Sequence, residues 1–194
     1  QCGGCLFIKG NRRAWRQRLT DATPPLPGKV WEMDSLSLRE NGGYMTMFVD
    51  RTSTLSMTWA HDDLTSEGLR IIIGRQRAKV RPTHGECAVF KTDALSAMKS
   101  HAMATFAADD DVDVGAATFE ISIAPGGVHE WVALPENKFG IIVPMAVALL
   151  RGTALSEKKG IRYMLWCAED VLNLFRVKRG QKHPPIRIFN DAAS

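Results

Sequence analysis

The stretch GKVWEMDSLSL, residues 28–38, holds a carboxylate where a strand is predicted. Residues 30–38 have the pattern of a β-strand, and Asp34 stands in the middle of it. Side chains two residues apart share one face of a strand, so Asp34 is expected on the same face as Glu32 and Leu36. Strand interiors are depleted in Asp, and a buried carboxylate costs free energy unless it is paired or binds a metal. Asp34 is therefore the first candidate functional residue of the chain.

Length and composition are those of an ordinary globular protein. The 194 residues suffice for one well-buried domain, and the hydrophobic and charged contents of 45% and 24% lie in the globular range. No apolar run approaches the roughly 18 residues of a membrane span, and no secretory signal peptide is predicted. The four cysteines do not form a secreted disulfide framework. We therefore expect an intracellular protein that works without a membrane.

Positive charge is concentrated near the two ends of the chain, whose net charge is +4. Basic ends on a compact core predict a polyanionic partner, of which nucleic acid is the usual one. The alternative is a pair of solubilising tails. The two basic groups are Lys9, Arg12, Arg13, Arg16 and Arg18 near the N-terminus, and Arg176, Lys178, Arg179, Lys182 and Arg187 near the C-terminus.

The order of predicted elements favours a mixed α/β domain. A proline-rich linker over 23–28 is followed by three strands in succession, the first two joined by an NGG turn. Helices and strands then alternate, which predicts an antiparallel meander fused to parallel βαβ units in one five-stranded sheet flanked by helices. The predicted strands are 30–38, 44–50, 53–60, 86–93 and 117–124, and the predicted helices are 64–77, 94–106, 136–150 and 161–177.

Further carboxylates fall at places where such a sheet collects its ligands. Asp93 stands at the carboxyl end of the fourth strand, and Glu130 and Glu136 lie near the start of the next helix. Converging carboxylates repel one another and need a cation, and oxygen ligands favour Mg²⁺ or Mn²⁺. Taken singly, such an acid is more often a solvent-facing side chain, a cap or a charge favoured by a helix N-terminus than a metal ligand, and only the joint placement favours a metal site.

Several stretches resemble the integrases of copia-type retrotransposons, in the retroviral integrase superfamily. The resemblance covers most of residues 1–177. The matching stretches are VWEMD (30–34), GGYMTMFVDRTSTLSMTWA (42–60), FKTD (90–93), PGGVHE (125–130), IIVPMAVALL (141–150) and YMLWCAEDVLNLF (163–175), together with CGGCLFIKGNRR (2–13).

This resemblance implies an RNase H-like catalytic core over 28–178 with a triad of two aspartates and one glutamate. Asp34 and Asp93 match the aspartates. The PGGVHE stretch and its spacing from Asp93 select Glu130 as the glutamate, whereas counting back from AVALL selects Glu136. The implied activity is Mg²⁺-dependent processing of the 3′ ends of element DNA and their transfer into host DNA in the nucleus, without a small-molecule cofactor. Asp50 matches a family position at which the aspartate is structural rather than a metal ligand.

The resemblance also implies two further segments and a set of partners. Residues 1–27 resemble the last part of a zinc module that runs into a basic linker, with Cys2 and Cys5 as Zn²⁺ ligands whose two histidine partners would precede Gln1. Residues 179–194 are predicted to be a basic tail. Related integrases act as multimers, so self-association is expected. The predicted DNA contacts are Lys9, Arg12, Arg13, Arg16, Trp131 and Lys138.

Two alternative functions stay open. One is an RNase H-type nuclease, which would use an additional acid on the first helix, where Glu67 is available. The other is a catalytically inactive integrase remnant that binds nucleic acid or assembles with a partner. Departures from the family motifs after Asp93 and Glu130 agree with this second alternative.

Overall fold

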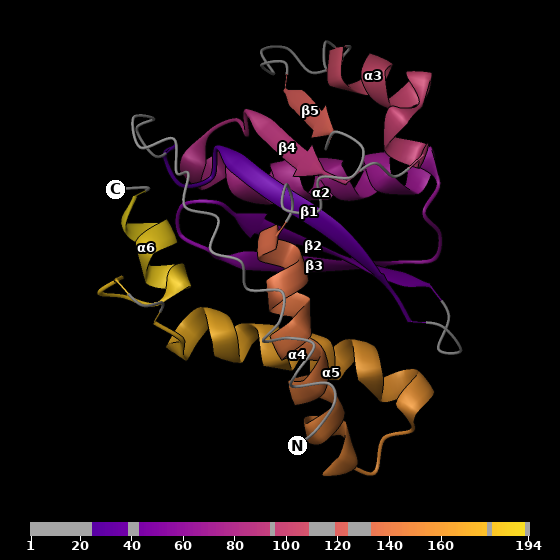
Figure 1. Cartoon of the computed structure of the whole chain (residues 1–194), viewed down its shortest axis with the longest axis vertical. Helices are drawn as coiled ribbons and strands as arrows, with labels where there is room; N and C mark the ends of the chain where they lie inside the picture. Colours follow the sequence, from indigo (N-terminus) through magenta and orange to yellow (C-terminus); the bar gives the residue numbers. More distant parts are fainter. Residues whose placement is uncertain are drawn as a thin grey trace, which may run out of the picture.

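A single five-stranded mixed sheet organises the molecule (Figure 1). The computed structural model describes residues 25–38, 43–93, 96–108, 119–123, 133–177 and 180–192. Its elements are β1 (Val30–Ser37), β2 (Tyr44–Asp50), β3 (Ser56–His61), α2 (Ser66–His84), β4 (Val89–Thr92), the 3₁₀ helix η2 (Ser96–Lys99), α3 (His101–Ala108), β5 (Glu120–Ile123), α4 (Ala133–Arg151), α5 (Glu157–Phe175) and α6 (Pro185–Asp191).

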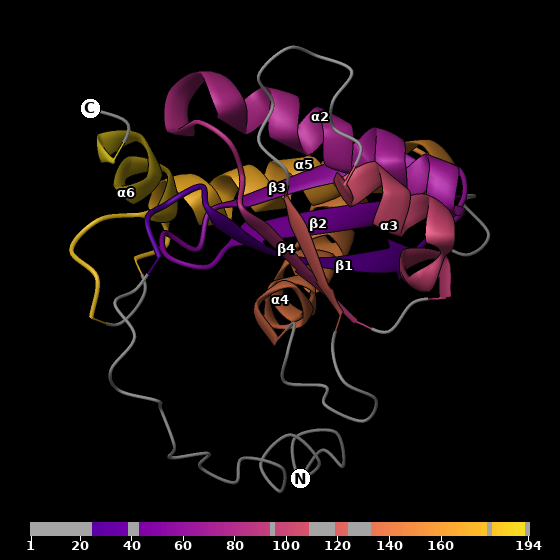
Figure 2. The same cartoon turned by 90° about the horizontal axis from the view of Figure 1, so that it is seen from above.

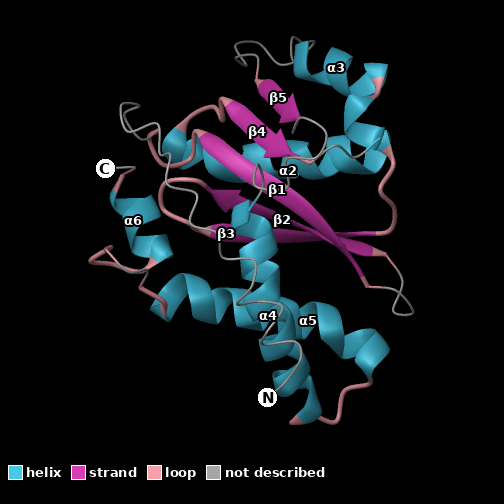
Figure 3. Ribbon diagram, in the orientation of Figure 1, coloured by secondary structure: helices cyan, strands magenta, loops and turns pink. Residues whose placement is uncertain are grey.

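The sheet has the strand order β3-β2-β1-β4-β5. β1 pairs antiparallel with β2, and β2 pairs antiparallel with β3. On its other side β1 pairs in parallel with β4, which pairs in parallel with β5. This arrangement confirms the predicted fold class, a three-stranded meander joined to parallel units in an RNase H-like sheet (Figure 3).

Helices cover both faces of the sheet, with α2 and α3 on one side and α4 on the other (Figure 2). The α2-side core includes Trp31, Met33 and Phe48 from the central strands. The α4-side core includes Met47 from β2 and Phe139 from α4, together with buried residues of α5. Since alternate residues of β1 face opposite sides, Glu32 and Asp34 point to the side of α4.

The turn after β2 is held by a buried aspartate. Asp50 accepts hydrogen bonds from Gly28 N at 2.8 Å and from both the amide and the hydroxyl of Ser53 at 2.7 Å. These bonds tie the start of β1 to the turn that follows β2. The structural role that the family resemblance implies for Asp50 agrees with these contacts.

The C-terminal segment differs from the predicted basic tail. Residues 185–191 form helix α6, and Phe189 is only 4% exposed in the α2-side core. Its ring stacks on His84 with centroids 3.8 Å apart and meets Trp31 edge-on at 5.7 Å. The charge of this segment suggested a tail, but its aromatic residue supplies enough apolar surface to bind it to the domain.

Several element boundaries also differ from prediction. α2 continues to His84 although it contains Pro82, and α4 continues to Arg151 although it contains Pro144. The helix predicted over 94–106 is a 3₁₀ turn followed by the short α3.

In the part of the chain that the structure describes, α4 is the one helix that could cross a membrane by length and composition, with a mean hydropathy of 1.4. Its residues Phe139, Ile142 and Ala146 are buried in the α4-side core, as is usual for an apolar helix that packs on a sheet.

Candidate functional site

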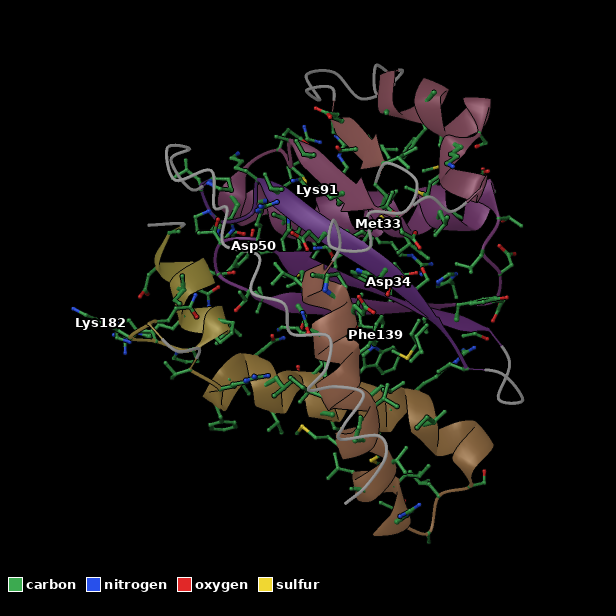
Figure 4. All side chains as sticks on the ribbon, in the orientation of Figure 1. Met33, Asp34, Asp50, Lys91, Phe139 and Lys182 are labelled. Atoms are coloured by element: carbon green, nitrogen blue, oxygen red, sulfur yellow. The ribbon has the colours of Figure 1, made fainter. Side chains whose placement is uncertain are left out.

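Asp34 lies in the middle of β1, the central strand of the sheet (Figure 4). Its side chain is partly buried, and Asp34 Oδ1 accepts a hydrogen bond from the amide of Ser35 at 2.7 Å. In the antiparallel register it faces Met47 of β2. Asp34 therefore lies inside the first strand, as the sequence pattern predicted.

Two further carboxylates act on Asp34 through their charges. Burial raises the pKa of Asp34 above its ordinary value, and the negative charges of Asp93 and Glu136 raise it further, while the Ser35 amide acts in the opposite direction. Asp93 follows β4 directly, and Glu136 lies in the first turn of α4. The end of β4 and the start of α4 therefore place two of the other predicted carboxylates, Asp93 and Glu136, near enough to Asp34 to raise its pKa.

The remaining predicted site residues lie outside the described residues. These are Glu130, Trp131, the zinc candidates Cys2 and Cys5, and the basic residues Lys9, Arg12, Arg13 and Arg16. Of the two candidate glutamates, the structure describes the position of Glu136 but not that of Glu130. The choice between them stays a prediction.

The donor chemistry of the three carboxylates fits a hard divalent cation. All of the donors are oxygens, which Mg²⁺ and Mn²⁺ prefer, and the repulsion that raises the pKa of Asp34 is the kind that a bound cation offsets. Across the described residues, however, no three acidic, histidine or cysteine side chains are close enough to hold a metal ion together. A bound cation would require the three carboxylates to approach one another.

Glu32 is a residue of this site that the motif analysis did not single out. It is buried, with its Oε1 atom 3.6 Å from Arg51 and its Oε2 atom accepting a hydrogen bond from Leu134 N at 3.2 Å. Lys91 is its neighbour across the parallel register with β4. The available signal was a second acid two residues before Asp34, on the same face of the strand.

Lys138, a predicted DNA contact, is hydrogen-bonded within the protein. Its Nζ atom donates to Ser56 Oγ at 3.0 Å and to Asn173 Oδ1 at 3.3 Å, and burial lowers its pKa to about 8. These contacts direct the ammonium group at protein oxygens, and the DNA contact of Lys138 stays a prediction that they do not support. A lysine near a helix start gives no sequence signal of whether it faces inward.

Glu67, the acid available to an RNase H-type nuclease, forms an exposed ion pair with Arg70 at 3.2 Å on α2. The charges that raise the pKa of Asp34 are instead those of Asp93 and Glu136. The described arrangement thus gives more support to a site of two aspartates and a glutamate than to one that includes Glu67.

Comparison with known proteins finds similarity in structure but not in sequence. No protein-family model matches the chain, and no curated protein sequence matches it. The catalytic core domain of BIV integrase superposes with a TM-score of 0.62 at 13% identity, covering 85% of this chain and 95% of that chain.

Two further structures extend the comparison. The HTLV-2 integrase catalytic core domain in complex with magnesium, in a trimeric form, superposes with a TM-score of 0.61 at 18% identity, covering 86% of this chain and 99% of that chain. A chain of the simian T-cell lymphotropic virus intasome in complex with the PP2A regulatory subunit B56 gamma superposes with a TM-score of 0.67 at 15% identity. The match covers 96% of this chain and 66% of that chain. At these identities the likeness concerns the fold: the chain has the RNase H-like fold of retroviral integrase catalytic cores.

Proposed function

We propose that this chain is the catalytic core of a retrotransposon integrase, which processes the 3′ ends of element DNA and joins them to host DNA in the nucleus. The observation that carries the proposal is the partly buried Asp34, whose pKa is raised by burial and by the charges of Asp93 and Glu136. In a fold like that of integrase cores, one of them solved with magnesium, this cluster is the best candidate for the reacting centre.

In this proposal Asp34, Asp93 and Glu136 hold Mg²⁺ or Mn²⁺, with Glu130 as the alternative glutamate that the sequence favours. Bound divalent ions supply activation of the attacking oxygen and stabilisation of the leaving oxygen in phosphodiester displacement. The protein's own contribution is to hold the three carboxylates in β1, directly after β4 and at the start of α4, and to shield Asp34 from water. Basic residues near the N-terminus bind the DNA backbone, and Cys2 and Cys5 belong to a Zn²⁺ site.

A second candidate function is nucleic-acid binding without catalysis. The observation that favours it is the spacing of the acids, since the described residues contain no group close enough to hold a metal ion. Such a protein would keep the fold and the basic ends and would bind DNA equally well with and without divalent ions.

Calorimetric titration with Mn²⁺ at low ionic strength separates the two candidates. We expect the wild-type protein to bind Mn²⁺ and Asp34→Asn to lose this binding. Strand transfer by Asp34→Asn should fall more than about 100-fold. This exceeds the roughly 10–100-fold loss typical of changing a residue that only hydrogen-bonds to a metal ligand. Glu67→Gln, an exposed acid of α2, is the matched control and should bind Mn²⁺ normally.

The same titration identifies the glutamate. If Glu136→Gln loses Mn²⁺ binding and Glu130→Gln keeps it, Glu136 is the third ligand, and the reverse result selects Glu130. Absence of Mn²⁺ binding by the wild-type protein would leave the non-catalytic function. Hydrolysis of DNA or RNA without strand transfer would point to the RNase H-type nuclease.

We also propose that the protein self-associates through α5. Similar integrase cores have been solved in trimeric and dimeric forms. The outer side of α5 carries an apolar stripe of exposed residues, and its end residue Phe175 is 74% exposed. Large exposed apolar surface commonly marks a protein interface, and a second copy of this chain is the partner that we assign to it. The residues of this α5 stripe are Tyr163, Val171, Leu174 and Phe175.

A further inference from the structure

Glu32 is an acidic residue in an unusual place, because its ionisable side chain is buried in the sheet. It is 5% exposed and stands two residues before Asp34 on the same face of β1. A buried charge is retained at a cost of free energy unless hydrogen bonds and opposite charges compensate for it. Its partners therefore indicate why the residue is there.

Those partners come from three different parts of the chain. Arg51, just after β2, lies 3.6 Å from Glu32 Oε1, and Lys91 of β4 interacts with the same carboxylate through its charge. The second oxygen, Oε2, accepts the hydrogen bond from Leu134 N at 3.2 Å. Leu134 is in the first turn of α4, where amide groups have no partner within the helix and a negative charge is favoured by the helix dipole.

We infer that Glu32 is a positioning residue that fixes the start of α4, and with it Glu136, over Asp34. The inference rests on the proposed function of the three carboxylates. One contact, from Glu32 to Leu134, joins the two elements that carry Asp34 and Glu136. Each of these acids lies two residues beyond the contact in its own element.

Apolar packing alone does not give this precision. Phe139 and Ile142 bury α4 against the sheet, but burial of apolar surface is non-directional, so it permits small shifts and rotations of the helix. A hydrogen bond has a narrow range of length and angle. The hydrogen bond from Leu134 N to the Glu32 carboxylate therefore sets the position of the first turn of α4 relative to β1. Arg51 and Lys91 compensate for the charge of this carboxylate.

Two substitutions test the contact from its two sides. Glu32→Ala removes the acceptor, whereas Glu32→Gln keeps an acceptor oxygen. Leu134→Pro removes the donor N–H together with a leucine side chain that packs on the α4-side core, and proline is tolerated in a first helical turn. Leu134→Ala removes the same side chain, keeps the amide, and should bind Mn²⁺ like the wild-type protein. Ala133→Pro is the matched control, since it places proline in the same turn and leaves the Leu134 amide in place. Glu120→Ala is the charge control, because Glu120 is an exposed acid that also acts on Lys91.

Two readouts distinguish positioning from a merely structural role. In Glu32→Ala we expect hydrogen exchange of the Leu134 amide to accelerate about 10- to 100-fold, as for loss of a hydrogen bond to a charged group. Calorimetry should show Mn²⁺ affinity lowered roughly 10- to 100-fold in Glu32→Ala and in Leu134→Pro. Glu32→Gln, Ala133→Pro and Glu120→Ala should stay close to wild type in Mn²⁺ affinity.

The outcomes separate this inference from the proposed function. If the wild-type protein binds Mn²⁺ through Asp34 but Glu32→Ala and Leu134→Pro bind it equally well, the positioning role is overturned and the proposed function stands. Faster exchange of the Leu134 amide with unchanged Mn²⁺ affinity would likewise reduce Glu32 to a structural residue. If the wild-type protein binds no Mn²⁺, both the proposed function and the positioning role fail.

Discussion

Lys138 of α4 and Glu169 of α5 are opposite charges that act on each other across the interface of the two helices. The pKa of Lys138 is lowered to about 8 by burial, and the negative charge of Glu169 acts in the opposite direction. Burial raises the pKa of Glu169, which accepts a hydrogen bond from Thr58 Oγ1 at 2.6 Å. Buried opposite charges stabilise a fold only modestly, because desolvation offsets their attraction. The main effect of Lys138 and Glu169 is therefore on how the free energy of unfolding depends on pH.

The free energy of unfolding should therefore increase with pH between about 8 and 10.5 through Lys138. Its pKa is about 8 in the folded protein against an ordinary value of 10.5. In this window the unfolded chain binds more protons at Lys138 than the folded protein does, so raising the pH favours the folded state. From pH 7 to pH 9 the gain is about 1 kcal/mol. Urea denaturation of the wild-type protein and of Lys138→Met at several pH values measures it.

The difference in unfolding free energy between the wild-type protein and Lys138→Met should disappear as the pH rises. Equal pH dependence in both proteins would contradict the lowered pKa of Lys138. Cys87 sets the upper limit of the experiment. Burial raises its pKa from 9.0 to about 12, so its ionisation in the unfolded chain lowers the stability of the fold as the pH rises above about 9.

The sequence was sufficient to predict that Asp34 is unusual, because an aspartate inside a strand conflicts with strand preferences. It could not predict the surroundings of Lys138 or Glu32. Their roles depend on contacts with Asn173 and Leu134, which are 35 and 102 residues away in the chain. A local pattern contains no information on such contacts.

At the scale of elements, α5 supplies hydrogen-bonding partners to the edge strand β3. Trp166 Nε1 donates to Thr58 O at 3.1 Å, and Glu169 Oε2 accepts from Thr58 N at 3.2 Å. One turn further on, Asn173 accepts from Ser56 N at 3.1 Å and donates to Ser56 O at 2.8 Å. These contacts satisfy backbone groups that would otherwise offer an edge for pairing with another chain.

Asn173→Leu should therefore destabilise the protein and open this edge. The change keeps the approximate size of the side chain but removes the partners of Ser56 N and Ser56 O, which leaves buried backbone groups unsatisfied at a cost of about 2–4 kcal/mol. Urea denaturation measures this loss, and hydrogen exchange of the Ser56 and Thr58 amides should accelerate. Asp170→Leu, at an exposed position of the same helix, should change the stability by less than about 0.5 kcal/mol. Equal stability of the two variants would show that α5 does not protect the edge.

The elements themselves were largely predictable, and the reasons are local. The NGG sequence and the alternation in residues 53–60 predict the antiparallel strands, and the later alternation of helices and strands predicts the parallel ones. Helix α6 was missed because a short segment with several basic residues resembles a tail, and its burial depends on the distant partners Trp31 and His84.

At the scale of the whole molecule, the α5 stripe predicts the oligomeric state. Phe175→Asp places a charge on its most exposed residue and should shift the protein from dimer or higher multimer to monomer in sedimentation velocity experiments. Ile71→Asp makes the same change at an exposed apolar residue of α2 and should leave the multimer intact. A monomeric wild-type protein, or equal effects of both changes, would argue against self-association through α5.

The basic residues near the N-terminus should contribute directly to DNA binding. Each phosphate neutralised by a lysine or arginine contributes about 0.9 to the slope of log affinity against log salt concentration. Replacing Arg12 and Arg13 together by alanine should reduce the magnitude of this slope by about 2. Arg75 and Lys79 are two exposed basic residues of α2. Replacing them by alanine removes the same charge and should change the slope little. Fluorescence anisotropy with a short DNA duplex in EDTA measures both slopes without metal-dependent cleavage.

The two pairs of substitutions also separate a DNA-binding segment from a solubilising one. If Arg12 and Arg13 only keep the protein in solution, their loss lowers solubility but leaves the slope unchanged. If both pairs reduce the slope equally, DNA binds to the general positive charge of the molecule, in agreement with its net charge of +4. A selective effect of the N-terminal pair would place the DNA backbone along the segment that precedes β1, the strand that carries Asp34.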